Sequence, residues 1–297
     1  MKLTAMQKRE WRVGSLFLLP NIFGFLAFTL IPVIGGFILS FTDYNGFNIS
    51  KLKFMGLSNF INLFHDDYFL VALKNTLVYA FASVLLTLLL SLLLALALTK
   101  KRPLSGLFKT VFYFPSITAM VAVAIVWGMM FNPTGGPVNS FLMSVGFKNP
   151  PGWLVSTKWS MVSVVIVAVW KNAGYYMIMI LSGLLSIPTE FYEAAEIDGA
   201  NSWKKFWNVT WPLLSPTMFM VTILAVIGSF QVFDLVYIMT QGGPGDSTSV
   251  LVLRIYQESF VNTNFGYASA MAYFLFLLIL IFTLIQFRGQ KKITYMQ

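Results

Sequence analysis

The sequence predicts an all-α integral membrane protein with six transmembrane helices, and three observations lead to this prediction. Hydrophobic residues make up 57% of the 297 residues and charged residues only 10%, which is too little polar surface for a soluble protein of this size. Six stretches reach the roughly 20 apolar residues that a helix needs to cross a bilayer. No stretch alternates apolar and polar residues with a period of two, as membrane strands do.

The six predicted spans belong to a single domain that covers residues 1–297, without a long soluble insert. We place the spans at residues 14–41, 75–99, 111–131, 160–187, 217–239 and 267–287. The first apolar run is longer than that of a signal peptide and lacks a small-residue cleavage site, so we expect it to remain in the mature protein. Within it, Pro20 and Pro32 predict kinks rather than breaks.

Lysine and arginine gather on one side of the six spans. The two termini and the second and fourth connectors carry Lys2, Lys8, Arg9, Arg12, Lys100, Lys101, Arg102, Lys109, Lys204, Lys205, Arg288, Lys291 and Lys292. The opposite side carries fewer, namely Lys51, Lys53, Lys74, Lys148, Lys158 and Arg254. The positive-inside rule therefore places both termini in the cytoplasm. Short basic runs at span ends indicate orientation in a membrane and no nucleic-acid partner.

The cytoplasmic connector between the fourth and fifth spans, residues 188–216, has an unusual composition. Its segment "EFYEAAEID" predicts a short helix that ends at Gly199, which can adopt a left-handed conformation. Helical spacing places small or apolar side chains on one arc and carboxylates on another; the arcs are Phe191, Ala194 and Ala195, and Glu190, Glu193 and Glu196. Such a helix can dock in a groove lined by Arg or Lys. The alternative interpretation is a solvated linker, but such a linker needs only a few polar residues and would not need this ordered pattern.

A second helix is predicted after Gly199, with Ser202 as its N-cap. Aromatic residues recur in it at intervals of three and four, which is typical of a helix in the lipid headgroup layer. We expect this helix to lie along the membrane interface and to transmit motion into a span that begins after Pro216.

The connector resembles the EAA loop of ABC-importer permeases. The pattern consists of "EAAEIDGA", with Glu193 to Ala195 and Gly199, followed by "VTWPLLSP". The segments "LSGLLSIPTEFYEAAEIDGA", "VFDLVYIMTQGGPGDSTSVLVLRIYQESF" and "NFGYASAMAYFL" are similar to the branch that imports oligosaccharides and glycerol-phosphate, and the likeness covers the chain from about residue 70 onward. Trp211 stands where the family usually has Leu.

The resemblance implies a set of partners in a bacterial or archaeal cell membrane. They are a second homologous permease, two copies of a cytoplasmic ATPase subunit and an extracellular or periplasmic solute-binding protein. ATP and Mg²⁺ would bind to the ATPase subunits, so we expect no cofactor, metal or catalytic residue in this chain, which also has no cysteine and no phosphate-binding loop. The connector helix would be the coupling helix, with contacts from Glu190, Glu193, Ala194, Ala195, Glu196, Asp198 and Gly199.

Polar residues in the fourth and fifth spans are the candidates for contact with a solute. Sugars are bound by hydrogen-bonding groups and by aromatic rings, and the spans supply Lys171, Asn172, Tyr175, Tyr176, Ser229, Gln231 and Asp234. Lys171 and Asp234 either form an interhelical ion pair or face a watery cavity, because charges are costly inside a membrane. We favour the cavity for Lys171, because the two residues differ in predicted depth by roughly 9 Å at 1.5 Å per residue.

Two other functional classes are weaker. An ion-coupled secondary transporter of a small polar solute needs membrane-buried carboxylates, and Asp234 is the single candidate. A membrane enzyme would need a cluster of buried His, Cys or carboxylate residues, and the only histidine is His65, in the polar patch "FHDDYF".

Overall fold

The computed structural model describes residues 4–47, 52–99 and 103–294. In these ranges the chain is helical, and the only β-pairing is an isolated bridge between Thr42 and Phe54. The predicted all-α fold is confirmed. The helices form two compact units, the first comprising Met1–His65 and Ile255–Phe274 and the second Asp66–Arg254 and Leu275–Gln297.

The first unit contains a helix that runs without a break through α1 (Ala5–Phe25), the π-helical turn η1 (Leu26–Leu30) and α2 (Ile31–Leu39). Its two prolines lie inside the helical stretch, as predicted. The unit also holds α3 (Ser58–Leu63) and η4 (Gln257–Val261). Tyr273 packs its ring against Phe37 at 5.1 Å and donates a hydrogen bond to the carbonyl of Val33, so the start of the last long helix contacts α2.

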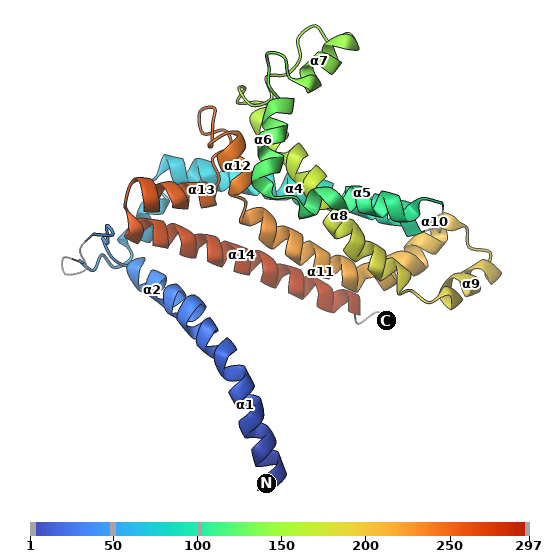
Figure 1. Cartoon of the computed structure of the whole chain (residues 1–297), viewed down its shortest axis with the longest axis horizontal. Helices are drawn as coiled ribbons and strands as arrows, with labels where there is room; N and C mark the ends of the chain where they lie inside the picture. Colours follow the sequence, from blue (N-terminus) through green and yellow to red (C-terminus); the bar gives the residue numbers. More distant parts are fainter. Residues whose placement is uncertain (1–3, 48–51, 100–102, 295–297) are drawn as a thin grey trace. The chain divides into compact units, whose positions relative to one another are not determined.

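The second unit is built around α8 (Ser160–Leu185), which packs against α4 (Asp67–Thr99), α5 (Ser105–Ile117) and α11 (Trp211–Phe230) (Figure 1). Smaller helices are α6 (Met120–Met130), α7 (Pro137–Ser144), α12 (Asp234–Met239) and α13 (Leu251–Tyr256), the last ending at the border with the first unit. Buried apolar side chains fill the contact between α4, α8 and α11; they include Ala95, Met177, Ile180, Leu184, Leu214 and Val221. The helix α14 (Phe265–Thr294) starts in the first unit and ends in the second.

Small residues let α8 approach its neighbours closely. A Cβ atom on Gly174 would lie 1.8 Å from the carbonyl oxygen of Phe112 in α5, and one on Gly183 would lie 2.6 Å from the Thr217 hydroxyl in α11. On α4, the buried Ser91 hydroxyl donates to the carbonyl of Ala173 at 2.8 Å. The packing of α8 against its three neighbours therefore leaves no room for larger side chains at Gly174 and Gly183.

Five helical stretches in the described part of the chain are long and apolar enough to cross a membrane, and the bent pair α5–α6 would make a sixth. Four of them correspond to the first, second, fourth and sixth predicted spans; they are Val13–Leu39, Asp67–Thr99, Ser160–Leu185 and Phe265–Gly289. The other two predicted spans need correction.

The third predicted span, residues 111–131, is wrong as a single helix, because α5 and α6 meet at 98°. Thr118 and Ala119, between the two helices, have extended backbone angles. In a continuing helix the Thr118 N–H would donate to the carbonyl of Phe114. Here that carbonyl accepts a bond from the Thr118 hydroxyl at 3.2 Å, and the Thr118 N–H donates to the carbonyl of Pro115. The extended backbone at Thr118 and Ala119 thus ends α5 and begins the turn into α6.

The fifth predicted span, residues 217–239, is wrong at both ends. The helical stretch is Ser202–Phe230, comprising α10 (Ser202–Lys205), the π-helical turn η3 (Phe206–Thr210) and α11. It continues through Pro216 because the Ser215 hydroxyl donates to the carbonyl of Pro212 at 2.7 Å, replacing the N–H that Pro216 lacks. The predicted second helix is therefore continuous with the helix of the fifth span and is not a separate element. The stretch ends at Phe230, and Asp234 begins the separate helix α12.

Several cations used for the predicted orientation, Lys2, Lys51, Lys100, Lys101 and Arg102, lie outside the described residues. The cytoplasmic placement of the termini therefore remains a prediction.

Candidate functional site

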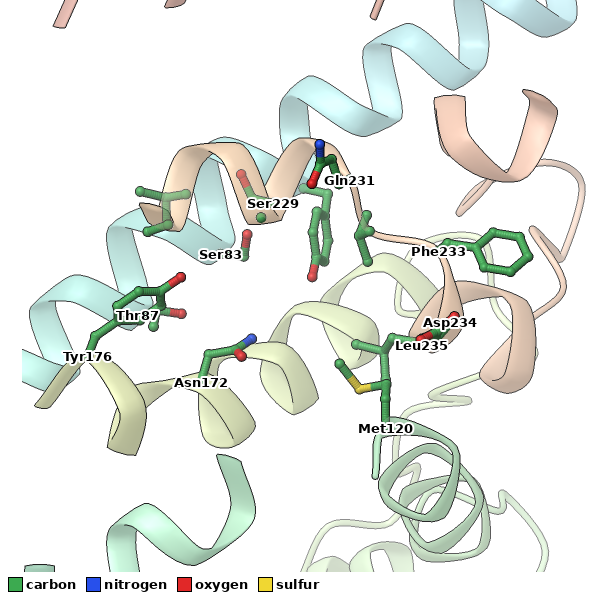
Figure 2. A pocket seen from close by; sticks show the side chains of 15 residues that line it. Ser83, Thr87, Met120, Asn172, Tyr176, Ser229, Gln231, Phe233, Asp234 and Leu235 are labelled. Carbon is green, nitrogen blue, oxygen red and sulfur yellow. The ribbon is translucent and has the colours of Figure 1, made fainter. Parts of the chain in front are cut away.

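A polar cavity of about 240 Å³ lies in the second unit, between α4, α8 and α11 (Figure 2). The first residue of α6 and the first residues of α12 complete its wall. Five of the seven predicted solute-path residues line it, namely Asn172, Tyr176, Ser229, Gln231 and Asp234. The structure therefore brings together side chains from the fourth and fifth spans, as expected for a common site.

Asn172 and Tyr176 contribute the α8 side of the cavity, one helical turn apart. The Asn172 amide nitrogen donates to the carbonyl of Ala168 at 2.9 Å, in the preceding turn of its own helix. Its amide oxygen has no hydrogen bond to the residues that the structure describes, so this oxygen can accept a bond from a hydroxyl group in the cavity. The Tyr176 ring adds an aromatic surface and a phenol group to the same wall.

The end of α11 contributes Ser229, and the residues that follow contribute Gln231 and Asp234. Ser229 is 8% exposed, and its hydroxyl donates to the carbonyl of Val226 at 2.8 Å. Gln231 and Asp234 are exposed, because the helix has ended and the chain turns into α12. Polar side chains thus gather where α11 ends and α12 begins, and pockets between helices are a common setting for ligands.

The sequence analysis missed the contribution of α4, whose residues Tyr79, Ser83 and Thr87 line the cavity. Their spacing of four residues places them on one face of the helix. With Thr76 and Ser91 they form a polar stripe along an otherwise leucine-rich span, and this stripe is the signal that could have identified them. Met120, the first residue of α6, also lines the cavity, but its position depends on the break after α5.

Lys171 and Tyr175 do not line the cavity. Lys171 is 7% exposed, and its ammonium group donates to the carbonyl of Ser116 in α5 at 3.0 Å. It forms no ion pair with Asp234, both residues being within the described ranges. Tyr175 is 44% exposed and meets the ring of Tyr176 edge-on at 5.2 Å. The two pairs of residues therefore lie on different faces of α8, and only the face of Asn172 and Tyr176 reaches the cavity.

The predicted short helix of the connector is present as α9 (Thr189–Ile197) and ends as predicted at Gly199, where φ is +72°. Two backbone bonds close its last turn, from Ala200 N to Ala195 O at 2.8 Å and from Gly199 N to Glu196 O at 3.0 Å. This pair of bonds is the Schellman motif. The predicted N-cap of the next helix, Ser202, is wrong by one residue, because the Asn201 side chain accepts the bond from the Lys204 N–H.

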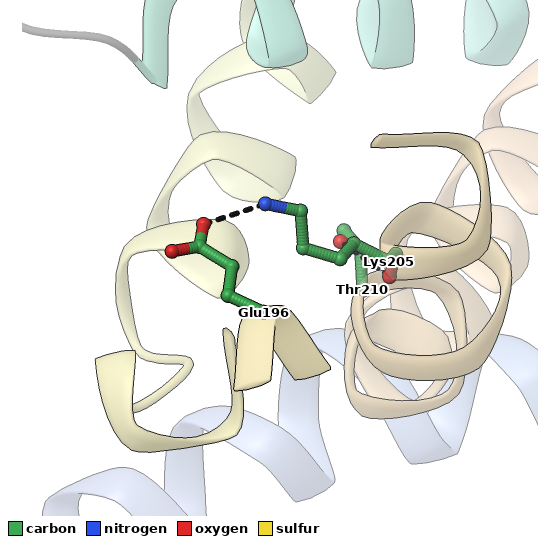
Figure 3. Close-up of polar contacts among 3 residues, drawn as sticks. All are labelled: Glu196, Lys205 and Thr210. Atoms are coloured by element: carbon green, nitrogen blue, oxygen red, sulfur yellow. Dashed lines mark hydrogen bonds and ion pairs between the residues drawn. The ribbon is translucent and has the colours of Figure 1, made fainter. Parts of the chain in front are cut away.

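Two side-chain contacts join α9 to the helix that follows it. The Lys205 ammonium lies 2.6 Å from a carboxylate oxygen of Glu196 (Figure 3), and the hydroxyls of Tyr192 and Thr210 lie 3.0 Å apart. The opposite face of α9 is exposed, with Glu190, Phe191, Glu193, Ala194 and Ile197. Neither Glu190 nor Glu193 forms an ion pair with another described residue. The exposed face therefore presents two carboxylates and an apolar stripe.

We expect Lys205→Met to change the stability of the protein by less than about 1 kcal/mol, because exposed ion pairs contribute little. Glu196 is 63% exposed, so water screens this pair. The thermal melting of the purified protein measures the effect. A loss of stability larger than this would contradict the prediction and would show that the ion pair is important for the contact between α9 and α10.

Residues 87–295 match the sequence profile of the binding-protein-dependent transport system inner membrane component family. The chain belongs to this family. It is accordingly a multi-pass membrane permease, and the match includes α8 and α11, which line the cavity, and the short helix α9. This membership favours the importer hypothesis over the ion-coupled carrier.

Relatives of the permease match it along almost their whole length. The lactose transport system permease protein LacF of Rhizobium radiobacter is 37% identical over 291 residues, which cover 96% of each chain. The probable ABC transporter permease protein YurN of Bacillus subtilis is 34% identical over 282 residues, covering 94% of this chain and 96% of the relative.

A solved structure of similar fold is a chain of a bacterial alginate ABC transporter, in complex with a periplasmic protein that holds an alginate pentasaccharide. The TM-score is 0.84 at 26% identity, and the match covers 97% of the permease and 96% of that chain. The similarity of fold therefore extends over nearly the whole of the permease.

Proposed function

We propose that the permease forms half of the translocation pathway of an ATP-driven importer for sugars of oligosaccharide size. The observation that carries the proposal is the full-length similarity to LacF and to the arabinooligosaccharide permease AraP of Bacillus subtilis, which is 34% identical over 276 residues. The other half of the pathway would be a second homologous permease.

The chemistry of the polar cavity supports a sugar as the solute. Hydroxyl groups from Ser83, Thr87 and Ser229, amides from Asn172 and Gln231, and the ring of Tyr176 surround the space. Such groups exchange hydrogen bonds with sugar hydroxyls, while the ring packs on the apolar face of a sugar. At about 240 Å³ the cavity is smaller than the roughly 300–1,000 Å³ of pockets that enclose a drug-sized ligand. It suits one part of a longer solute at a time.

The exposed face of α9 supports coupling to cytoplasmic ATPase subunits. In the proposal, two copies of the ATPase bind ATP and Mg²⁺, and one copy contacts the coupling helix through Glu190, Glu193, Ala194 and neighbouring residues. Motion of α9 would reach the cavity along one helical stretch, Ser202–Phe230, which ends next to Gln231. The termini and α9 would face the cytoplasm, and an extracellular or periplasmic solute-binding protein would deliver the sugar on the opposite side.

Purification from native membranes tests the proposal. A tagged permease should co-purify with an ATPase subunit and a second permease, and proteoliposomes containing the complex and its binding protein should take up radiolabelled lactose or maltotriose only when ATP is supplied. Uptake driven by an ion gradient without ATP would support the ion-coupled carrier instead.

Removing polar groups from the cavity should weaken transport without preventing assembly. We expect Asn172→Ala and Gln231→Ala each to raise the KM for uptake by about 3- to 10-fold, since one hydrogen bond contributes roughly 0.5–1.5 kcal/mol. Val162→Ala, an exposed position on the same helix as Asn172, is the matched control and should leave uptake unchanged. If the two cavity variants fail to assemble, these residues pack between helices and do not contact a solute.

A further inference from the structure

The buried lysine of α8 has no partner of opposite charge among the described residues. Lys171 lies within the 26-residue helix Ser160–Leu185 and is 7% exposed. The one hydrogen bond of its ammonium group goes to the carbonyl oxygen of Ser116, at 3.0 Å. A cation inside a membrane helix costs about 2.5–3.5 kcal/mol on insertion scales, and such residues usually serve a function. Lys171 is outside the cavity, so contact with the solute does not explain it.

The acceptor of this bond is the end of a helix. Ser116 is the next-to-last residue of α5, and the last four carbonyls of a helix have no partner within the helix. These carbonyls carry the negative end of the helix dipole, which a lysine stabilises. Beyond Ser116 the chain leaves the helix at Thr118 and turns by 98° into α6. The Lys171 ammonium group thus donates to the Ser116 carbonyl oxygen, which has no helical partner because α5 ends there.

A second contact fixes α8 against the same part of α5. Gly174, three residues after Lys171, lies so close to Phe112 that a Cβ atom would be 1.8 Å from the Phe112 carbonyl oxygen and 2.9 Å from the Tyr113 Cα. The two contacts are on the same face of α8, because residues three apart are neighbours on a helix. The C-terminal part of α5 therefore contacts α8 at two points, at Phe112 through Gly174 and at Ser116 through Lys171.

The break and the cavity are adjacent in the structure. Met120, four residues after Ser116, begins α6 and lines the cavity, and Asn172, the residue after Lys171, lines it from α8 (Figure 2). We propose that Lys171 is a positioning residue, which holds the break between α5 and α6 through Ser116 and so fixes Met120 in the cavity wall. The functional meaning of this position rests on the proposed transport of a solute through the cavity.

The absence of cysteine from the sequence allows a direct test. In the assembled complex with the Met120→Cys variant, the single thiol of the permease chain reports on the position of residue 120 through the rate at which N-ethylmaleimide alkylates this chain. We expect Lys171→Met to raise this rate by about tenfold or more, because the charge-assisted bond that holds the break is lost. Lys171→Arg, which keeps the charge and the donors, should leave the rate within about twofold of the parent value.

Two further variants separate positioning from general folding and from an ion pair. Ala95→Cys, at a position with 0% exposure in the core of the second unit, should stay unreactive when Lys171→Met is added. If Lys171→Met makes both thiols reactive, Lys171 has only a general role in folding and the proposal is overturned. The proposal is also overturned if Lys171→Met does not change the alkylation rate of the thiol at residue 120. Adding Asp234→Leu should not restore the parent rate, and restoration would identify Asp234 as the true partner. The alkylation assay needs no uptake, so its outcome is independent of whether the solute is a sugar.

Discussion

The Gly174→Ala variant is expected to accumulate poorly in the membrane and to melt at a clearly lower temperature than the parent protein. The added Cβ would lie 1.8 Å from the Phe112 carbonyl oxygen and 2.6 Å from its carbonyl carbon. Both are backbone atoms, so no side-chain rotation relieves the overlap, and α5 would have to move away from α8. Overpacking a core usually costs about 1–3 kcal/mol, and we expect this substitution to reach at least the upper value. Size-exclusion chromatography of heated, detergent-solubilised complex measures the melting temperature.

Gly128→Ala is the matched control for this experiment. Gly128 is also a helical glycine, in α6, but a Cβ atom there would have no neighbour within 4 Å. Since alanine is a better helix former than glycine by up to about 1 kcal/mol, the control should be as stable as the parent or slightly more stable. Parent-like melting of Gly174→Ala would contradict the close approach of α5 and α8.

The apolar runs of the sequence predicted most of the fold, because hydropathy alone decides which stretches enter a bilayer. They predicted the first, second, fourth and sixth spans. The third and fifth spans were misplaced because their ends depend on which groups take over backbone hydrogen bonds. Ser215 replaces the missing N–H of Pro216 and lets one helix continue, whereas at Thr118 the backbone becomes extended and its N–H donates to Pro115. Hydropathy contains no information about such exchanges.

The candidate site could also be predicted only in part, because the sequence does not show which side chains face the cavity. Helical spacing separated Asn172 and Tyr176 from Lys171 and Tyr175, but it did not show which pair faces the cavity. That choice depends on α5, which supplies the carbonyl that Lys171 binds. The α4 wall was missed because serine and threonine are tolerated in membrane helices, where their hydroxyls bond to their own backbone. Thr76 and Ser91 form such bonds, to Ala72 and Thr87.

The Ala194→Trp variant is expected to insert and fold normally but to lose its ATPase subunit and, with it, ATP-driven uptake. Ala194 is exposed and lies three residues from both Phe191 and Ile197, which are 50% and 87% exposed. Residues three apart share a helix face, so the three form the apolar stripe that the proposed partner would contact. An indole in the middle of this stripe would separate the surfaces. Disruption at the centre of an interface costs 2 kcal/mol or more, or roughly a 30-fold loss of affinity.

Two neighbouring substitutions make the test specific to this face of α9. Ala194→Ser keeps the side chain small and should retain the ATPase subunit. Ala195→Trp changes a residue that is half-buried rather than exposed, so it should lower the melting temperature as well as uptake. Co-purification of the ATPase with the tagged permease and uptake in proteoliposomes are measured for all three variants. If Ala194→Trp retains its ATPase subunit and transports at the parent rate, α9 is not the helix that couples ATP hydrolysis to transport.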